Sequence, residues 1–472
     1  MLTTAHYISI ALTLAVVTMV GLLSFSKVKT SDDFIVGGRS LLPFGVTGAI
    51  VGSFAGGTVT IGTAQMAYKY GIGAIWFTLG AGISCLVLAL FLARPMREKK
   101  VSTVTEYLVD EYGKQIRTWV ALFTAIGMFI QIAVQVMAAV PVIIGMVPIS
   151  PFLAATLTVF LIILYIIGGG VWGTSMVGLI KLFLLSITLF TGGILSYLHL
   201  GGLHGARELL PTIPTFSLFP RGLALDLGGV FSTIVGFTST QTFLQPIFAG
   251  REVRSARMGA LGAAVFIPLY GLAGVAIGLF MRVAHPDINP AFALPVFFYM
   301  HLNPWLGGMA NATLLISLIL TGGALALGVS TVLTRDIYGF CRSGATDLEI
   351  LRVSRGIILG VGVLALALVF FSLNSLILDW TYLSNALRGA TVFLPLLGAV
   401  FLPGRIHPAG VHRAVILAPL ITLLWAYFSP VKLHPLFVGL PVVLLCMLTG
   451  VLLGTRVNSH TAIRSHNNIY HD

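Results

Sequence analysis

Five residues near the middle of one apolar stretch are suited to holding an ion or a solute through backbone groups. They lie within residues 43–71 and are Gly52, Ser53, Gly56, Gly57 and Thr58. Glycine and hydroxyl residues have low helix propensity, although a lipid-facing helix must bond every backbone group internally. A helix that unwinds beside a polar cavity offers free carbonyl and N–H groups to an ion or a solute. The stretch therefore predicts a broken membrane helix.

Two cationic side chains, Lys181 and Arg388, fall inside apolar stretches. Arg388 is too deep to reach the membrane interface easily, and an arginine at such a depth is functional by default. A guanidinium suits bidentate binding of a carboxylate, so Arg388 predicts an anionic or zwitterionic organic solute. The alternative is that Arg388 braces carbonyls of a broken helix. Among the acids only Asp226 and Asp379 approach the spans, and both lie near span ends, so a buried chain of carboxylates for proton pumping is not predicted.

A second interrupted stretch, residues 224–247, carries Gly228, Gly229 and Gly236 together with a run of hydroxyl residues. It lies five spans after the first, and glycine-interrupted helices at corresponding positions indicate inverted repeats with a binding site at the breaks. The alternative is that these glycines allow close helix packing. We expect the following residues around the two breaks to line the solute site: Ser53, Phe54, Thr58, Thr60, Thr238, Thr240, Gln241 and Gln245.

The composition places these residues on membrane helices. The chain has 472 residues, of which 57% are hydrophobic and 9% charged, with a mean hydropathy of +1.00. This composition is typical of an all-α polytopic membrane protein, in which each span takes about 20 residues. We predict thirteen spans: 5–26, 43–68, 72–96, 117–146, 151–170, 174–199, 224–247, 256–283, 304–334, 351–372, 377–403, 411–428 and 435–455. The net charge of +12 comes from basic residues scattered between spans, so no nucleic-acid partner is predicted.

The loop charges predict how the chain lies in the cell membrane. With the N-terminus outside, the cytoplasmic segments carry twenty Lys and Arg residues and the outer segments carry five. Because positive loops stay in the cytoplasm, we expect the N-terminus outside and the C-terminus inside. The predicted parts are an N-terminal helix and linker (1–42), repeat one (43–199), an outer loop (200–223), repeat two (224–403), and two C-terminal helices with a tail (404–472).

Four segments resemble the sodium:solute symporter family, and the resemblance extends over nearly the whole chain. They are DFIVGGRSL, RPMREKKVSTVTEYLVDEYG, QTFLQPIFAGREVRSAR and STVLTRDIYG, in the order and spacing of that family. The resemblance implies ten core helices in two inverted five-helix repeats whose first helices are broken, with one helix before and two after. That total equals the thirteen predicted spans.

The resemblance also implies a sodium site between the first break and the eighth core helix. Backbone carbonyls of Gly52 and Ala55 and hydroxyls of Ser317 and Thr321 are the matching positions. Leu320 stands where the family usually has a second hydroxyl, and sodium binding weakens when an oxygen ligand is lost.

The fifth core helix departs from the family as well. Gly178 and Lys181 replace the family's acid and glutamine there, and residues three apart share a helix face. We therefore hypothesise that Lys181 substitutes for sodium or competes with it. Burial would favour the neutral amine and make Lys181 a proton carrier. The alternative is that its long stem reaches the cytoplasmic interface.

The predicted function is a secondary active transporter that imports a small organic solute, expected to bear a carboxylate, by alternating access. Sodium or protons are the candidate coupling ions; no other cofactor is expected, and the partners are the solute and the lipid bilayer. A non-transporting sensor and a uniporter or exchanger with a degraded ion site are the alternatives. An enzyme is not predicted, since no nucleophile, metal cluster or acid–base set lies in the spans. The solute, the coupling ion and the oligomeric state stay open.

Overall fold

The computed structural model describes residues 2–24, 41–99, 101, 103–342, 346–373 and 375–467. Within these, the side chains of 20–24, 167–177, 453–467 and a few single positions are not described. The described residues are almost entirely helical, with one isolated bridge between Leu41 and Gly250. The helices of the first half are α1 Thr4–Ser24, α3 Pro43–Phe54, α4 Thr63–Tyr70, α5 Ile75–Val87, α6 Ala93–Glu98, α7 Val104–Tyr112, α8 Arg117–Met146, α9 Pro151–His199, α10 Gly202–Leu209 and α11 Thr212–Thr215.

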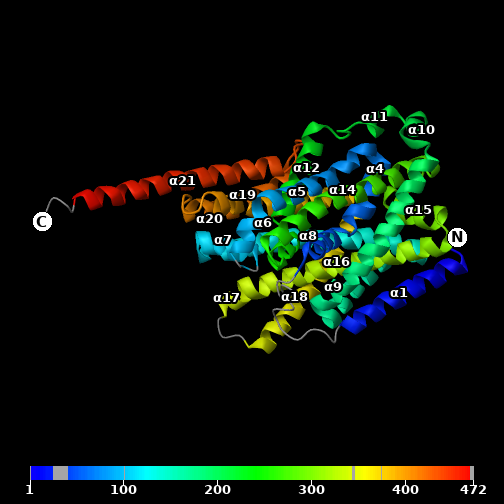
Figure 1. Ribbon diagram of the computed structural model, residues 1–472, viewed down its shortest axis with the longest axis horizontal. Coiled ribbons are helices and arrows are strands. Elements are labelled where there is room, and N and C mark those ends of the chain that lie inside the picture. Colours follow the sequence, from blue (N-terminus) through cyan, green and yellow to red (C-terminus); the bar gives the residue numbers. More distant parts are fainter. Residues whose placement is uncertain are drawn as a thin grey trace.

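The second half continues in the same all-helical manner. Its helices are α12 Leu223–Thr238, α13 Gln241–Ala249, α14 Val253–Ala284, α15 Ala293–His301, α16 Pro304–Val332, α17 Gly339–Cys341, α18 Asp347–Ser372, α19 Ile377–Phe401, α20 Pro408–Phe428 and α21 Leu436–Asn467. Short π- or 3₁₀-helical pieces join some of them, notably η3 Thr58–Gly62, η4 Gly71–Ala74, η5 Leu88–Leu92, η7 Pro290–Phe292 and η8 Leu333–Tyr338. In Figure 1, α10, α11 and α15 lie at the end of the bundle that holds the N-terminus, whereas α7 and α17 lie at the other end.

The described helices account for the predicted spans. Eight segments are long and apolar enough to cross a membrane, and the bent pair α12–α13 makes a ninth. Shorter apolar helices supply the remaining positions: Thr4–Met19, Pro43–Phe54, Pro151–Ile166 and Leu436–Leu452. The described residues of each predicted span therefore lie largely on helix, with Thr58–Glu98 covering the end of one span and the whole of the next.

Helix α9 contains two predicted spans, 151–170 and 174–199, in a single element. A Cβ at Gly322 of α16 would lie 2.7 Å from Cδ1 of Ile162. Lys181 donates a hydrogen bond to Thr321, the residue before Gly322. In a straight helix, residues 162 and 181 would be about 28 Å apart at 1.5 Å per residue. The two limbs of α9 therefore lie side by side on α16, as two separate spans require.

The first break falls where the weak helix formers predicted it. Helix α3 ends at Phe54, Ala55 leaves the helical region with ψ 66°, and the chain resumes as the π-helix η3 and then α4. A Cβ at Gly57 would lie 2.5 Å from the Cβ of Ala138 and 2.6 Å from Cδ2 of Leu318, whereas nothing lies within 4 Å of one at Gly52. Only glycine therefore lets the unwound segment approach α8 and α16 this closely.

The second break lies at Ser239 and Thr240, where α12 and α13 meet at 42°. The glycines of α12 precede it and serve packing: Gly229 faces the ring of Tyr382, and a Cβ at Gly236 would lie 2.5 Å from the Cβ of Asn385. Both interpretations of this stretch are therefore correct in part. The helix is broken, and its glycines allow α12 to pack closely on α19.

The connector 200–223 covers the ends of α4 and α5. Trp76 donates to the carbonyl of Leu218 at 2.7 Å and stacks on Phe219. Gly71 has φ +81° and packs against the backbone of Thr215, so a side chain there would clash. At the end of this connector, the guanidinium of Arg221 pairs with Asp226 and Asp379, at 2.7 and 2.6 Å. The two acids near the spans are thus both neutralised by an arginine of the connector.

Candidate functional site

The first break meets α16 and α9 around two hydroxyl groups. Ser317 and Thr321 are one turn apart on α16; Ser317 donates to the carbonyl of Ala55, and Thr321 accepts a hydrogen bond of 3.0 Å from the ammonium of Lys181. A Cβ at Gly56 would lie 3.3 Å from Oγ1 of Thr321, so the unwound chain adjoins the same hydroxyl. These contacts therefore bring together four of the residues predicted for the ion site: Ala55, Ser317, Thr321 and Lys181.

Lys181 is buried beside the break rather than extended to an interface. The residue is 3% exposed, and its ammonium contacts the middle of α16, which runs Pro304–Val332. No ion pair involves Lys181 in the parts of the chain that the structure describes. An ammonium has three N–H groups, and the hydrogen bond to Thr321 uses one of them.

Leu320 and Gly178 have different surroundings. Leu320 is buried in an apolar cluster with Val17 of α1 and Ile316, against which Ile180 and Leu184 also pack. Its side chain is therefore part of the packing between α1, α9 and α16. Gly178 has nothing within 4 Å of its Cβ position, and the same is true of Gly52, so neither position is closely packed.

A row of polar residues connects the two breaks between α8 and α19. The amide of Gln135 accepts from the backbone N–H of Gly57 at 2.8 Å, which holds the unwound segment on α8. One turn earlier, Nε2 of Gln131 donates to the hydroxyl of Thr58 at 2.9 Å. Oγ1 of Thr58 lies 3.4 Å from Oγ1 of Thr381 on α19. The hydroxyl of Thr58 is therefore shared between Gln131 of α8 and Thr381 of α19.

Arg388 occupies the other end of this row. Its guanidinium donates to the hydroxyl of Thr240 at 2.7 Å, to Oδ1 of Asn385 at 2.7 Å, and to Ser384 twice, at the carbonyl (3.2 Å) and the hydroxyl (3.0 Å). The side chain is 2% exposed, and its stem crosses Gly127 of α8, where a Cβ would lie 2.6 Å from Cγ of the arginine. Arg388 thus braces the second break, although through a hydroxyl of Thr240 rather than through carbonyls. A bidentate contact with a carboxylate would have to replace some of these bonds.

We call this row the polar ladder; it consists of Thr58, Gln131, Thr240, Thr381, Ser384, Asn385 and Arg388. Two of its buried polar atoms have no hydrogen-bond partner among the described residues: Oε1 of Gln131 and Nδ2 of Asn385. Buried polar atoms in native proteins are almost always bonded. These two atoms are therefore candidates for contact with a bound solute.

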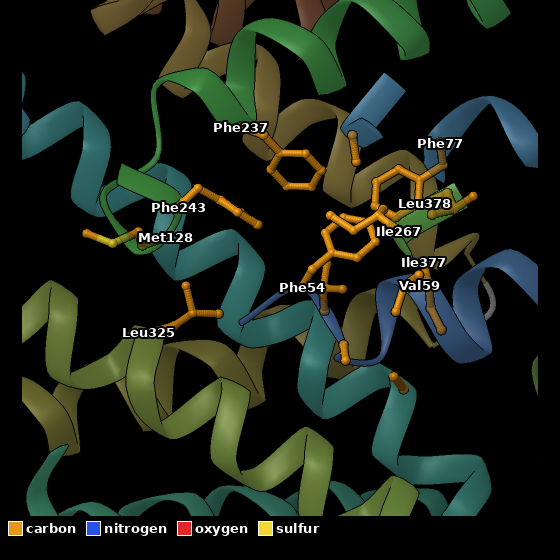
Figure 2. Close-up of a cluster of buried hydrophobic side chains, with 14 of the residues drawn as sticks. Phe54, Val59, Phe77, Met128, Phe237, Phe243, Ile267, Leu325, Ile377 and Leu378 are labelled. Atoms are coloured by element: carbon orange, nitrogen blue, oxygen red, sulfur yellow. The ribbon is translucent and has the colours of Figure 1, made fainter. Parts of the chain in front are cut away.

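An aromatic group adjoins the ladder. Phe54 at the end of α3, Phe77 of α5, Phe237 of α12 and Phe243 of α13 are within ring contact, with centroids 4.6 to 6.2 Å apart. Figure 2 shows these four side chains gathered together where the broken helices meet. Phe77 also contacts Tyr382 of α19 at 6.0 Å. The two breaks therefore carry a polar ladder and an apolar wall of aromatic rings.

The other predicted lining residues have partners within the protein. Thr60 and Thr238 are buried and donate to backbone carbonyls of their own segments, Gly56 and Ile234. Ser53 is exposed and donates to the carbonyl of Ala49. Gln241 accepts from the N–H of Val104 in α7, and Gln245 is half-buried. Of the predicted solute residues, Phe54, Thr58, Thr240 and Arg388 meet in the aromatic group and the ladder.

Sequence reasoning missed five residues that contact the breaks or complete the ladder: Gln131, Gln135, Thr381, Ser384 and Asn385. A signal was present. Gln131 and Gln135 are four apart in an otherwise apolar span, and Thr381, Ser384, Asn385 and Arg388 recur at helical spacing in another. Such spacing puts each set on one helix face. Which faces meet depends on packing between spans.

Two broken helices that meet inside a bundle of apolar helices define the class of membrane transporters with inverted repeats. Solved structures agree on the fold. A Na+-coupled sialic acid symporter in its substrate-bound, outward-open state has a TM-score of 0.78 at 17% identity, covering 96% of this chain and 98% of that one. Mhp1, a nucleobase-cation-symport-1 family transporter, has a TM-score of 0.59 at 12% identity, covering 90% and 95%.

The family model for the sodium:solute symporter family matches residues 34–417, and the chain belongs to this family. It is 23% identical over 398 residues to the osmoregulated proline transporter OpuE of Bacillus subtilis (79% of each chain). It is 25% identical over 426 residues to the human high affinity choline transporter 1 (81% of this chain, 69% of the relative). An uncharacterized symporter of B. subtilis, YwcA, is 24% identical over 372 residues (73% and 71%). The protein is thus a multi-pass membrane transporter and not an enzyme, as its sequence predicted.

Proposed function

We propose that the protein is a secondary transporter that imports a small organic solute and uses Lys181 in place of the sodium ion at the first break. Alternating access would occur between repeats at 43–199 and 224–403, with the N-terminus outside the cell membrane and the C-terminus in the cytoplasm. The observation that carries the proposal is the bond of 3.0 Å between the ammonium of Lys181 and Thr321, beside the Ser317–Ala55 contact.

Electrostatics supports the replacement. Sodium requires a nearly complete oxygen cage, and Leu320 has removed one hydroxyl from it. Two unit positive charges about 4 Å apart repel by about 4 kcal/mol at an effective dielectric constant of 20, which weakens binding by roughly a thousandfold. An ammonium at Thr321 and a sodium ion at the same hydroxyl therefore exclude each other. Transport would then be coupled to protons carried by Lys181, or it would proceed without any ion gradient.

Charge balance supports a solute with a carboxylate. Lys181 and Arg388 are both buried, and in the described parts of the chain neither has an acidic partner. Burying uncompensated charge is costly, so a negative charge near the ladder is favoured. The human relative is named for choline, which is a cation; two buried cations disfavour a solute of that kind here.

The test is solute accumulation in vesicles that contain the purified protein. Proline, choline, myo-inositol, lactate, 2-hydroxy-4-methylpentanoate and 3-phenyllactate are supplied with a sodium gradient, a proton gradient or neither, and the vesicle contents are measured by mass spectrometry. We expect uptake of a carboxylate without sodium, and loss of that uptake in Lys181→Gln. Lys69→Gln, which changes an exposed lysine at the end of α4, is the matched control.

Each outcome bears on the proposal. Strict dependence on sodium in the wild type would contradict the replacement by Lys181 while leaving transport intact. A Lys181→Gln variant that gains sodium dependence would support it further. Uptake of no solute under any gradient, by protein that melts cooperatively, would contradict transport and favour a sensor.

A further inference from the structure

We propose that Gln131 and Asn385 of the polar ladder are the specificity residues of the solute site, and that they select small carboxylates carrying a hydroxyl group over amino acids and unsubstituted acids. The inference rests on the transport function proposed above and names the substrate class of the same site. The two side chains come from α8 and α19, which pack against each other beside both breaks.

Gln131 supplies an acceptor. Its Nε2 is used in the bond of 2.9 Å to Thr58, and its Oε1 is buried without a partner among the described residues. An unsatisfied buried carbonyl oxygen costs stability, and a donor on a bound molecule removes that cost. The group that fits must donate a hydrogen bond, as a hydroxyl does. A plain hydrocarbon at the same place leaves the oxygen unpaired.

Asn385 supplies a donor. Its Oδ1 accepts from Arg388 at 2.7 Å, which makes Nδ2 the free end of the amide, and that nitrogen is buried without a described partner. Its two N–H groups match the oxygen of a carboxylate. The positive charge of Arg388 lies directly behind the amide and polarises it toward an anion. Arg388 therefore acts through Asn385 and needs to give up none of its own four bonds.

The separation of the two amides sets the size of the solute. Nε2 of Gln131 lies 2.9 Å from Oγ1 of Thr58, which in turn lies 3.4 Å from Oγ1 of Thr381. Asn385 follows Thr381 by one turn of α19. One helical turn separates side chains by about 5 to 6 Å. A molecule of a few heavy atoms can therefore contact both amides, and the neighbouring aromatic wall of Phe54, Phe77, Phe237 and Phe243 suits an apolar substituent.

The charges separate hydroxy acids from amino acids. The hydroxyl of a hydroxy acid and the ammonium of an amino acid could each donate a hydrogen bond to Gln131. The ammonium, however, would add a third cation beside the buried Lys181 and Arg388. A hydroxy acid brings one negative charge and no positive one. Repulsion between like charges in a medium of low dielectric constant therefore disfavours the amino acid.

The experiment compares nine acids on three carbon skeletons. Propanoate, 4-methylpentanoate and 3-phenylpropanoate are each supplied as the 2-hydroxy, the unsubstituted and the 2-amino compound, and dissociation constants are taken from the concentration dependence of the melting temperature of the purified protein. On at least one skeleton we expect the hydroxy acid to bind roughly tenfold tighter than the unsubstituted acid, the value of one hydrogen bond to a buried group. The amino acid is expected to bind more weakly than the hydroxy acid.

Two variants assign the effect. Gln131→Met is expected to abolish the preference for the hydroxyl, so that the hydroxy acid and the unsubstituted acid bind with dissociation constants within about threefold of each other. Asn385→Leu is expected to weaken the binding of the hydroxy, unsubstituted and amino acids to a similar extent. Asn311→Leu removes another buried amide, on α16 and outside the ladder, and controls for the loss of an amide in general.

The inference is overturned if none of the nine acids binds, if an amino acid binds tightest on every skeleton, or if Gln131→Met keeps the hydroxyl preference. These results leave the transport proposal standing when proline, choline or myo-inositol accumulates in the vesicles. If hydroxy acids bind but no solute is taken up, the transport proposal is contradicted and the assignment of the binding site stands.

Discussion

The two breaks each hold one buried cation, and they differ in how that cation is bonded. Lys181 and Arg388 are 3% and 2% exposed, so burial does not separate them. Lys181 has the hydrogen bond to Thr321 as its described polar contact, whereas Arg388 makes four hydrogen bonds to three residues. A cation held by many bonds fixes structure, and a cation held by one can change its protonation or position. The second break is therefore suited to rigidity, and the first is suited to a change in the protonation or position of its cation.

The side-chain types suit these two roles. A guanidinium is planar, stays charged and presents five donors in a fixed fork, whereas an ammonium is a compact charge on a flexible stem that can lose its proton when buried. Arg388 connects α19 to the break between α12 and α13 through Thr240, and its stem packs over Gly127 of α8. Among the described residues, the polar contact of Lys181 connects α9 and α16.

The largest expected effect is at the rigid break. Arg388→Lys keeps the buried charge but offers three donors where the arginine makes four hydrogen bonds, so at least one bond to a charged group is lost. Because a flexible ammonium also lacks the geometry of the fork, the free energy of unfolding is expected to fall by roughly 3 kcal/mol. Thermal melting of the purified protein measures the loss, with Arg352→Lys on the exposed side of α18 as control. A melting temperature equal to that of the wild type would remove the bracing role from Arg388.

The packing of the first break is tested next, by two glycines five residues apart. Gly57→Ala places a Cβ 2.5 Å from Ala138 and is expected to cost about 1 to 3 kcal/mol because a well-packed interface must shift. Gly52→Ala has open space around it and is expected to stabilise the protein by about 0.5 to 1 kcal/mol through lower backbone entropy of the unfolded chain. If both variants have the same melting temperature, the first break does not depend on close contact with α8 and α16.

A smaller effect is expected when Lys181 loses its partner. Thr321→Val leaves the ammonium without that acceptor and is expected to cost about 1 to 2 kcal/mol. Combining it with Lys181→Met should recover most of the loss, since the charge that needed the hydroxyl is gone. Melting of both single variants and of the double variant gives the coupling energy. Additive losses would mean that the two residues act independently.

The smallest effect on stability is expected for Lys181→Met alone. Removing a buried cation without a described acidic partner relieves desolvation, so the melting temperature is expected to stay within about 2 °C of the wild type or to rise. Uptake into vesicles, measured on the same preparation, is expected to fall at least tenfold. A large loss of stability would place Lys181 with Arg388, as a structural brace.

Local sequence features predicted the fold and the positions of the breaks. Apolar spans of about 20 residues follow from the thickness of the bilayer, and the breaks fall where Gly56, Gly57 and the hydroxyl residues of 238–240 weaken the helix. These are properties of neighbouring residues, so they are visible without tertiary structure. The identification of Lys181 and Arg388 as unusual also needed only their position within apolar spans.

The partners of these residues were decided by tertiary packing alone. Thr321 lies 140 residues from Lys181, Thr240 lies 148 residues from Arg388, and Gln131 meets Thr58 across 73 residues. Sequence spacing gives the face of a helix on which a side chain lies, but not which other helix that face meets. For this reason the sequence by itself determined that two broken helices and two buried cations exist. Only the packing of α8, α16 and α19 decided that Arg388 makes four hydrogen bonds and Lys181 one described hydrogen bond, and that the two amides, each with one atom lacking a described partner, belong to one ladder.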